Sequence, residues 1–166
     1  MMNAEKEHLL RVLRDFRLLQ DVPEEQLSYL AGSLREERFP AGTEILREGE
    51  PGDRMFLLLE GEVDVLKRTV YGEPYVAATL CGGDHGTFGE MALVDQSERS
   101  ATITARTGCR TLSLSYEAFR ELCLRHPDAG VRVLLAVSRT LARDLRREND
   151  NLRLVYQALI EEIENG

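Results

Sequence analysis

The chain of 166 residues has the length of one ordinary domain, and its hydrophobic share of 43% is sufficient for a continuous core. No segment approaches the roughly 18 uncharged apolar residues of a membrane span, and the N-terminus lacks a signal-peptide core, so we expect a cytoplasmic protein. The net charge of −8, from 29 acidic and 21 basic residues, disfavours nucleic acid and anionic membranes as partners.

The N-terminal segment has the periodicity of helices. Apolar residues recur at three- and four-residue steps over Ala4–Leu19, which predicts a first helix. Pro23, followed by two acidic residues, predicts a break and the start of a second helix. We therefore expect residues 1–34 to form a helical segment.

The middle of the chain changes to the patterns of β-strands. Short apolar or alternating segments predict strands at residues 43–46, 55–59, 62–66, 75–80, 101–104 and 110–114. Glycines separate these segments, as the tight turns of an antiparallel sheet require. Residues 35–116 are therefore expected to form an antiparallel, jelly-roll-like β-roll, and the fold class is α+β.

The helical pattern returns after Ser115. One short helix is expected around Phe119 and Leu122, and a long helix from about residue 129 to residue 163. The long helix has apolar residues at coiled-coil spacing: Leu134, Leu141, Leu145, Leu152, Val155 and Leu159. Residues 117–166 are therefore expected to form C-terminal helices, of which the long one joins two chains in a homodimer.

A polar segment, residues 146–150, interrupts this apolar seam, and Glu148 stands where an apolar residue is expected. A solvated face, a polar layer that fixes the register of two helices, and a ligand contact all remain open as explanations.

One segment between two strands has the residue types of an anion site. Phe88–Leu93 is expected to form a short helix after a glycine, and the first amides of a helix lack intrahelical partners and can bind phosphate. Nine residues beyond Glu90, Arg99 opens the next strand, and its guanidinium can bind two phosphate oxygens at once.

Glu90 would repel a phosphate unless the ligand also carries a hydroxyl, because an ionised carboxylate can only accept hydrogen bonds. A ribose 2′-OH is such a donor. The pair of Glu90 and Arg99 therefore favours a cyclic ribose phosphate, and the alternative is an internal salt bridge between the two side chains.

The segment resembles the phosphate-binding cassette of the cyclic nucleotide-binding domain family. The matching residues are Phe88-Gly89-Glu90-Met91-Ala92-Leu93 and, after five residues, Arg99-Ser100-Ala101-Thr102-Ile103-Thr104-Ala105. A second family pattern, with glycines at strand turns, is matched by residues 45–61, where only Leu46 departs slightly. The resemblance covers about residues 16–150, and residues 98–101 are similar to the catabolite-activator branch of the family.

The resemblance implies that Arg99 binds the cyclic phosphate and that Glu90 binds the ribose 2′-OH. The amides of Gly89, Glu90 and Ala92 and the hydroxyl of Ser100 would complete the phosphate site. The neighbouring Phe88, Met91 and Ala101 belong to the same candidate ligand site.

The resemblance also implies a contact between the base and the long helix. Glu148 and Asn149 are the candidate residues, and Leu145 or Leu152 could cap the base instead. Family members selective for cGMP often have Thr directly after the cassette arginine, so Ser100 favours cAMP over cGMP.

The sequence gives no comparable pattern for catalysis or for metal binding. His8, His85 and His126 are not at metal-ligand spacing, and the three cysteines form no C-x-x-C pair. Serines and cysteines lack the motif context of a nucleophile. We therefore expect no enzyme activity, no metal and no cofactor.

Direct DNA binding is not expected either, because a helix-turn-helix module would have to follow the long helix, whereas the chain ends in acidic residues at Gly166. The predicted function is a cAMP-binding regulatory module that signals to an unidentified protein partner through its C-terminal helix. The alternative is a dimerisation module of the same fold that has lost useful nucleotide affinity.

Overall fold

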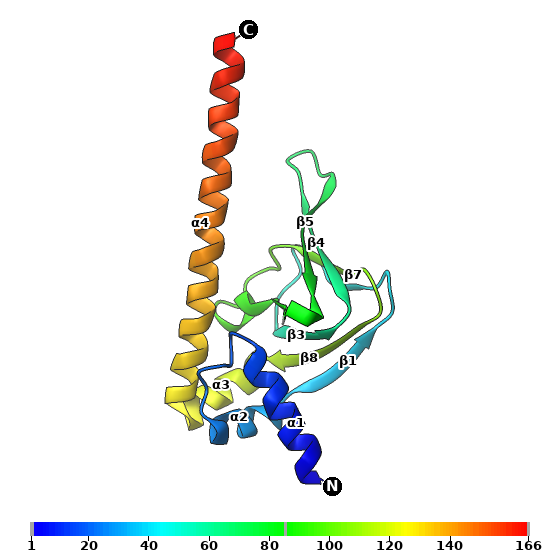
Figure 1. Cartoon of the computed structure of the whole chain (residues 1–166), viewed down its shortest axis with the longest axis vertical. Helices are drawn as coiled ribbons and strands as arrows, with labels where there is room; N and C mark the ends of the chain where they lie inside the picture. Colours follow the sequence, from blue (N-terminus) through cyan, green and yellow to red (C-terminus); the bar gives the residue numbers. More distant parts are fainter. Residues whose placement is uncertain (1, 85, 166) are drawn as a thin grey trace.

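Helices from both ends of the chain pack together beside a β-roll that the middle of the chain forms (Figure 1). The computed structural model describes residues 2–84 and 86–165. The helices are α1 (Met2–Asp15), α2 (Glu24–Ala31), α3 (Tyr116–Arg125) and α4 (Pro127–Asn165). The predicted α+β class is confirmed, with helices before and after an all-β middle.

Two four-stranded antiparallel sheets form the roll. The first sheet has the strand order β1 (Arg35–Phe39), β8 (Cys109–Ser115), β3 (Arg54–Glu60), β6 (Thr87–Phe88). The second has the order β2 (Glu44–Leu46), β7 (Thr102–Ala105), β4 (Glu62–Arg68), β5 (Pro74–Cys81). Short 3-10 helices, η1 (Gly82–Asp84) and η2 (Glu90–Leu93), lie on either side of β6.

Strand β3 joins two hydrophobic cores because its alternate side chains point to opposite faces of the sheet. Met55 and Leu57 belong to a core that the first sheet shares with the helices. Phe56 and Leu58 belong to a second core between the sheets. This burial on both faces explains the uninterrupted apolar run of β3. It also fixes the position of the strand, whose start lies beside the candidate site.

The structure differs from the sequence expectations at a few elements. Helix α1 ends at Asp15, and residues 16–22 form turns whose buried side chains include Phe16 and Leu19. Strands β1 and β6 were not expected as strands. The C-terminal helix agrees closely with the expected one, although it begins at Pro127.

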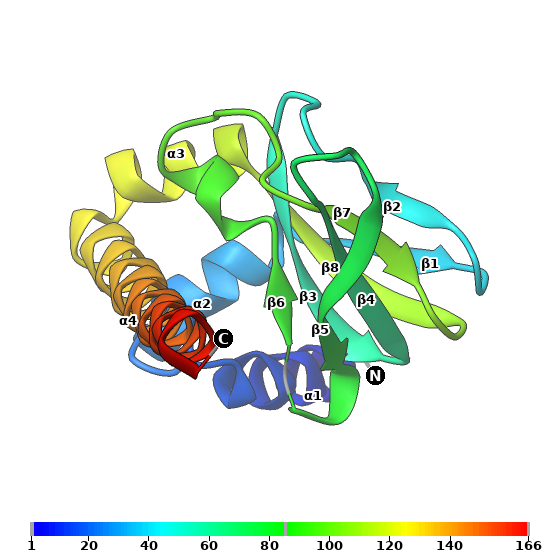
Figure 2. The same ribbon diagram turned by 90° about the horizontal axis from the view of Figure 1, so that it is seen from above.

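Helix α4 has a packed half and an unpacked half. Ala129, Val133 and Val137 are buried in the helical core, whereas every residue described from Leu145 onward is exposed. Figure 2 shows α4 alongside the side of the roll that carries β6, and Figure 1 shows its second half extending clear of the sheets. Within residues 2–84 and 86–165, the helices lack an apolar stretch long enough to cross a bilayer.

Candidate functional site

The cassette segment is fixed between the two sheets by Phe88 and then turned by Gly89. Phe88 is buried and stacks on Phe56 with ring centroids 5.1 Å apart. Gly89 has a φ of 75°, a left-handed conformation that glycine adopts without steric cost. Helix η2 follows at once, so this glycine sets the direction in which the chain continues to Glu90.

Arg99 lies at the centre of the site and is only 8% exposed. Its Nη1 donates to the carbonyl of Gly89 at 3.2 Å, and its Nη2 donates to the carbonyl of Arg54 at 2.8 Å. The guanidinium therefore joins the cassette to the start of β3.

Two glycines make room for this guanidinium. A Cβ at Gly89 would lie 2.7 Å from Arg99 Nη1, and a Cβ at Gly52 would lie 3.1 Å from Arg99 Cζ. Both distances are shorter than ordinary van der Waals contact, so side chains at these two positions would displace Arg99 or be displaced by it.

The charge of Arg99 is incompletely balanced by its neighbours. Burial lowers the pKa of Arg99, and Asp53 opposes that shift. The Asp53 carboxylate is 4.0 Å from Arg99 Nη2, and among the described residues it is the one ion-pair partner of this guanidinium. A buried cation that lacks a hydrogen-bonded carboxylate is a favourable place for an external anion.

Glu90 is half-buried beside the same guanidinium. Its pKa is raised, chiefly because burial disfavours the carboxylate, and Asp144 on α4 adds a repulsion that Arg99 partly offsets. Across residues 2–84 and 86–165, the ion pairs do not include one between Glu90 and Arg99. The two side chains thus share a site without closing it by a direct salt bridge.

Arg99 lines two cavities. A small cavity of about 50 Å³ is lined by Gly89, Glu90, Met91, Ala92, Ser97, Glu98, Arg99 and Ser100. Most of the predicted ligand-site residues thus lie together, and Phe88 and Ala101 are buried next to them in the chain. Glu148 and Asn149 lie on the exposed half of α4 and line neither this cavity nor the one described next.

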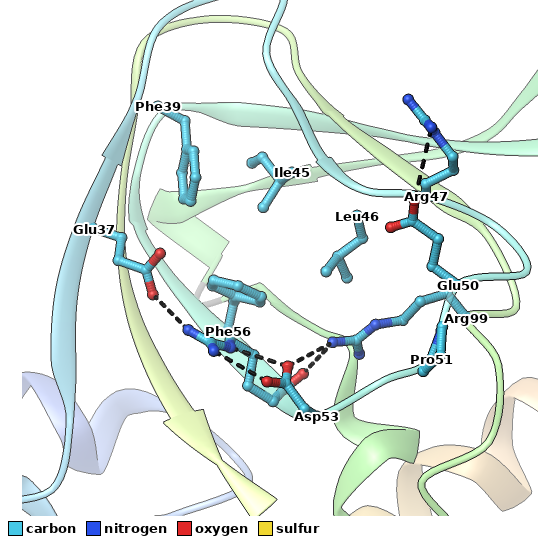
Figure 3. A pocket seen from close by; sticks show the side chains of 11 residues that line it. Glu37, Phe39, Ile45, Leu46, Arg47, Glu50, Pro51, Asp53, Phe56 and Arg99 are labelled. Carbon is cyan, nitrogen blue, oxygen red and sulfur yellow. Dashed lines mark hydrogen bonds and ion pairs between the residues drawn. The ribbon is translucent and has the colours of Figure 1, made fainter.

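The second cavity, of about 240 Å³, opens between β1, β2 and β3 (Figure 3). Its apolar wall consists of Phe39, Ile45, Leu46 and Phe56. Its charged rim includes Glu37, Asp53, Arg54 and Arg99, and ion pairs join Glu37 to Arg54, Arg54 to Asp53 and Asp53 to Arg99. This rim was not predicted from the sequence, although the charged pair Asp53-Arg54 at the start of a buried strand was an available signal.

The amides expected to complete the phosphate site are not equally available. The amide of Ala92 donates to the carbonyl of Gly89 at 3.2 Å, so it is engaged within the turn. The same carbonyl also accepts from Arg99. Because the Ala92 amide is engaged, the amides of Gly89 and Glu90 at the start of η2 are the better candidates for an anion.

Two of the three histidines lie away from this site. His8 is exposed on α1, and the ring of His126 contacts Tyr29 with centroids 5.0 Å apart. His85 lies outside the described residues. Within the described part of the chain, His, Cys, Asp and Glu side chains form no group of three that could hold a metal ion.

Comparison with known proteins identifies relatives of the whole site-bearing region. A family model for the cyclic nucleotide-binding domain matches residues 36–126. The chain is 31% identical over 135 residues to a CRP-like cAMP-activated global transcriptional regulator of Mycobacterium tuberculosis, covering 81% of this chain and 58% of the regulator.

Solved structures agree with this result. A cyclic nucleotide-binding domain from Methylobacillus flagellatus KT has a TM-score of 0.76 and 28% identity, over 89% of this chain and 82% of that one. The regulatory domain of Toxoplasma gondii PKA, solved with cAMP, has a TM-score of 0.65 and 30% identity, over 72% of this chain and 44% of that one.

Proposed function

The chain belongs to the cyclic nucleotide-binding domain family, and from this premise we propose that it binds cAMP and passes the binding signal to a partner through α4. The observation that carries the proposal is Arg99, a buried guanidinium with no hydrogen-bonded carboxylate, in one cavity with Glu90. A cyclic phosphate would supply the missing anion, and Glu90 would accept from the ribose hydroxyl. Domains of this family are typically regulatory and non-catalytic, and we propose no enzyme activity here.

The choice of cAMP over cGMP rests on Ser100, which follows the cassette arginine, and on the relatives. The Mycobacterium tuberculosis regulator is described as cAMP-activated, and the Toxoplasma gondii domain was solved with cAMP.

The three described thiols, Cys81, Cys109 and Cys123, are free. Free thiols are typical of reducing compartments, so we place the module in the cytoplasm.

Signalling through α4 requires two positions of this helix, and the bound ligand must make stronger contacts with the helix in one of them. Asp144 is close enough to Glu90 to raise its pKa, so α4 passes near the cassette. Glu148 and Asn149 follow one turn later, where we propose that they contact the base. Slower hydrogen exchange over residues 129–163 with cAMP is expected, and identical protection with and without cAMP would contradict this step.

Calorimetric titration of the full chain with cAMP and with cGMP tests the binding step. Arg99→Ala is expected to weaken cAMP binding at least about tenfold, because charge-assisted hydrogen bonds contribute roughly 1.5–3 kcal/mol each. Arg99→Lys keeps the charge but loses the two-pronged geometry, so its cAMP affinity should fall between those of Arg99→Ala and the unmodified chain.

Arg106→Ala is the matched control, because it removes an exposed arginine that ion-pairs with Glu62 and Asp64 of the roll. Thermal melting of each variant shows whether the fold persists. Equal cAMP affinity of Arg99→Ala and the unmodified chain would remove Arg99 from its role. No measurable binding by the unmodified, folded chain would reject the nucleotide-binding proposal.

The second candidate function, a dimerisation module without useful nucleotide affinity, is favoured by the exposed apolar residues of α4, which include Leu145, Leu152 and Leu159. We propose that these residues join two copies of the chain. The same titration separates the candidates, because only the first requires cAMP binding.

A further inference from the structure

Arg99 is hydrogen-bonded to the backbone of Arg54, while the side chain of Arg54 contacts a different residue. The backbone carbonyl of Arg54 accepts from Arg99 Nη2 at 2.8 Å. The side chain of Arg54 points instead to Asp53, to which its Nε and Nη2 donate at 3.0 Å each. Arg54 therefore contacts Arg99 through its backbone and restrains Asp53 through its guanidinium.

The two arginines share Asp53 unequally. Arg54 holds both carboxylate oxygens, whereas Arg99 Nη2 is 4.0 Å from the nearer oxygen. Two parallel hydrogen bonds between guanidinium and carboxylate form the stronger arrangement. In agreement, the hydrogen bond from Arg54 is the largest cause that lowers the pKa of Asp53, and the influence of Arg99 is smaller.

Arg54 is itself held from the opposite side of the cavity. Its Nη1 is 3.8 Å from Glu37 on β1, and Glu37 accepts a hydrogen bond from Ser113 on β8. These contacts keep the Arg54 guanidinium in the rim of the cavity, where it reaches Asp53. The side chain of Asp53 is 60% exposed, so Asp53 has space to turn once Arg54 no longer holds it.

We propose that Arg54 is a positioning residue that keeps Asp53 away from Arg99 and thereby leaves the Arg99 guanidinium available to the cyclic phosphate. This inference rests on the proposed function of Arg99. Without the Arg54 guanidinium, Asp53 is free to close the gap to Arg99 and to form a charge-assisted hydrogen bond with it. The ligand phosphate then competes with an internal carboxylate for the same cation, and its affinity falls.

The test is calorimetric titration of the full chain with cAMP. Arg54→Gln is expected to weaken cAMP binding about fivefold or more, since an internal competitor has been released. Arg54→Lys retains a cation near Asp53 but only one point of contact, so a smaller loss is expected.

Arg47→Gln is the matched control. Arg47 lies on the rim of the same cavity, is exposed, and pairs with Glu44 at 2.6 Å without contact to Asp53. Removal of this charge should change cAMP affinity less than about twofold, because an exposed charge is screened by solvent and salt. An equal effect of Arg47→Gln and Arg54→Gln would overturn the positioning role.

A double-mutant cycle separates competition from a merely structural role. In the Asp53→Asn background the carboxylate of residue 53 can no longer compete for Arg99, so Arg54→Gln should there have no more effect than Arg47→Gln. An undiminished effect of Arg54→Gln in that background would overturn the inference while leaving cAMP binding by the unmodified chain intact. Absence of cAMP binding by the unmodified chain would overturn the proposed function, and this inference with it.

Discussion

Glu90 combines two properties that oppose each other at the level of a single residue. As a carboxylate it suits a ribose hydroxyl, yet burial and the nearby Asp144 raise its pKa above the ordinary value of 4.5. Ionised Glu90 therefore costs folding free energy in the absence of ligand, because the unfolded chain solvates the same carboxylate fully. Buried groups with pKa values shifted in this way are common at functional sites.

Glu90→Gln should stabilise the free chain at neutral pH and weaken cAMP binding. The penalty of ionised Glu90 is fully present above the raised pKa, and it disappears as pH falls through that pKa towards the unfolded value. The stability gain of the variant is therefore expected at pH 7 and should vanish near pH 4. Chemical denaturation at a series of pH values measures it.

Glu73→Gln, in the exposed turn between β4 and β5, serves as the control for removal of one carboxylate. If both variants change stability equally at every pH, the buried environment of Glu90 is not the cause of its effect.

At the scale of elements, the turn between β6 and η2 depends on Gly89 for two separate reasons. The φ of 75° disfavours any side chain, and a Cβ would lie 2.7 Å from Arg99 Nη1. Gly42 has a similar φ of 83°, but a Cβ there would have no neighbour within 4 Å. A comparison of the two glycines therefore separates backbone strain from steric contact with Arg99.

Gly42→Ala and Gly89→Ala should each lose about 1 kcal/mol of stability or somewhat more from positive φ alone. Gly89→Ala should in addition weaken cAMP binding at least about tenfold, because the end of the flexible Arg99 side chain moves aside more easily than the backbone. Denaturation and calorimetry of both variants measure the two effects. Equal cAMP affinities of the two variants would show that the position of Arg99 tolerates a side chain at residue 89.

The elements that sequence analysis predicted correctly are those with strong local patterns. Helix α4 has long apolar periodicity, and strand β3 is a continuous apolar run. The expected helix Phe88–Leu93 is only partly correct, because Phe88 belongs to β6 and the 3-10 helix η2 begins at Glu90. Strand β1 has the sequence Arg-Glu-Glu-Arg-Phe, which is mainly polar and therefore lacks an apolar pattern. It forms a strand by pairing with β8. Strand β6 has two residues and depends entirely on its partner β3.

The candidate site was predicted only as far as its motif extends. Gly89, Glu90 and Arg99 are close in sequence, so their meeting follows from local chain geometry. Asp53 and Arg54 lie 46 and 45 residues before Arg99, and their contact with it arises from the way β3 packs beside the cassette. The charged pair Asp53-Arg54 is visible in the sequence, but its contact with Arg99 is not, because that contact depends on the register of the whole sheet.

At the scale of the whole molecule, α4 leaves a row of apolar side chains in water. Leu145, Leu152, Val155, Leu159 and Ile163 are all exposed on the half of the helix that extends clear of the roll (Figure 1). Their spacing of three, four and seven residues places most of them along one stripe of the helix. An isolated helix with this stripe gains stability by burying it against another helix, and an identical stripe on a second copy is the simplest complement.

Light scattering of the unmodified chain should therefore give the mass of a dimer, and Leu152→Asp should give that of a monomer. A buried aspartate in the seam would meet its own copy across a two-fold axis, so its charge would be both desolvated and repelled. Leu124→Asp is the control, because Leu124 is equally apolar and exposed but lies on α3, outside the stripe. A monomer mass for the unmodified chain, or dissociation by Leu124→Asp as well, would contradict pairing through α4.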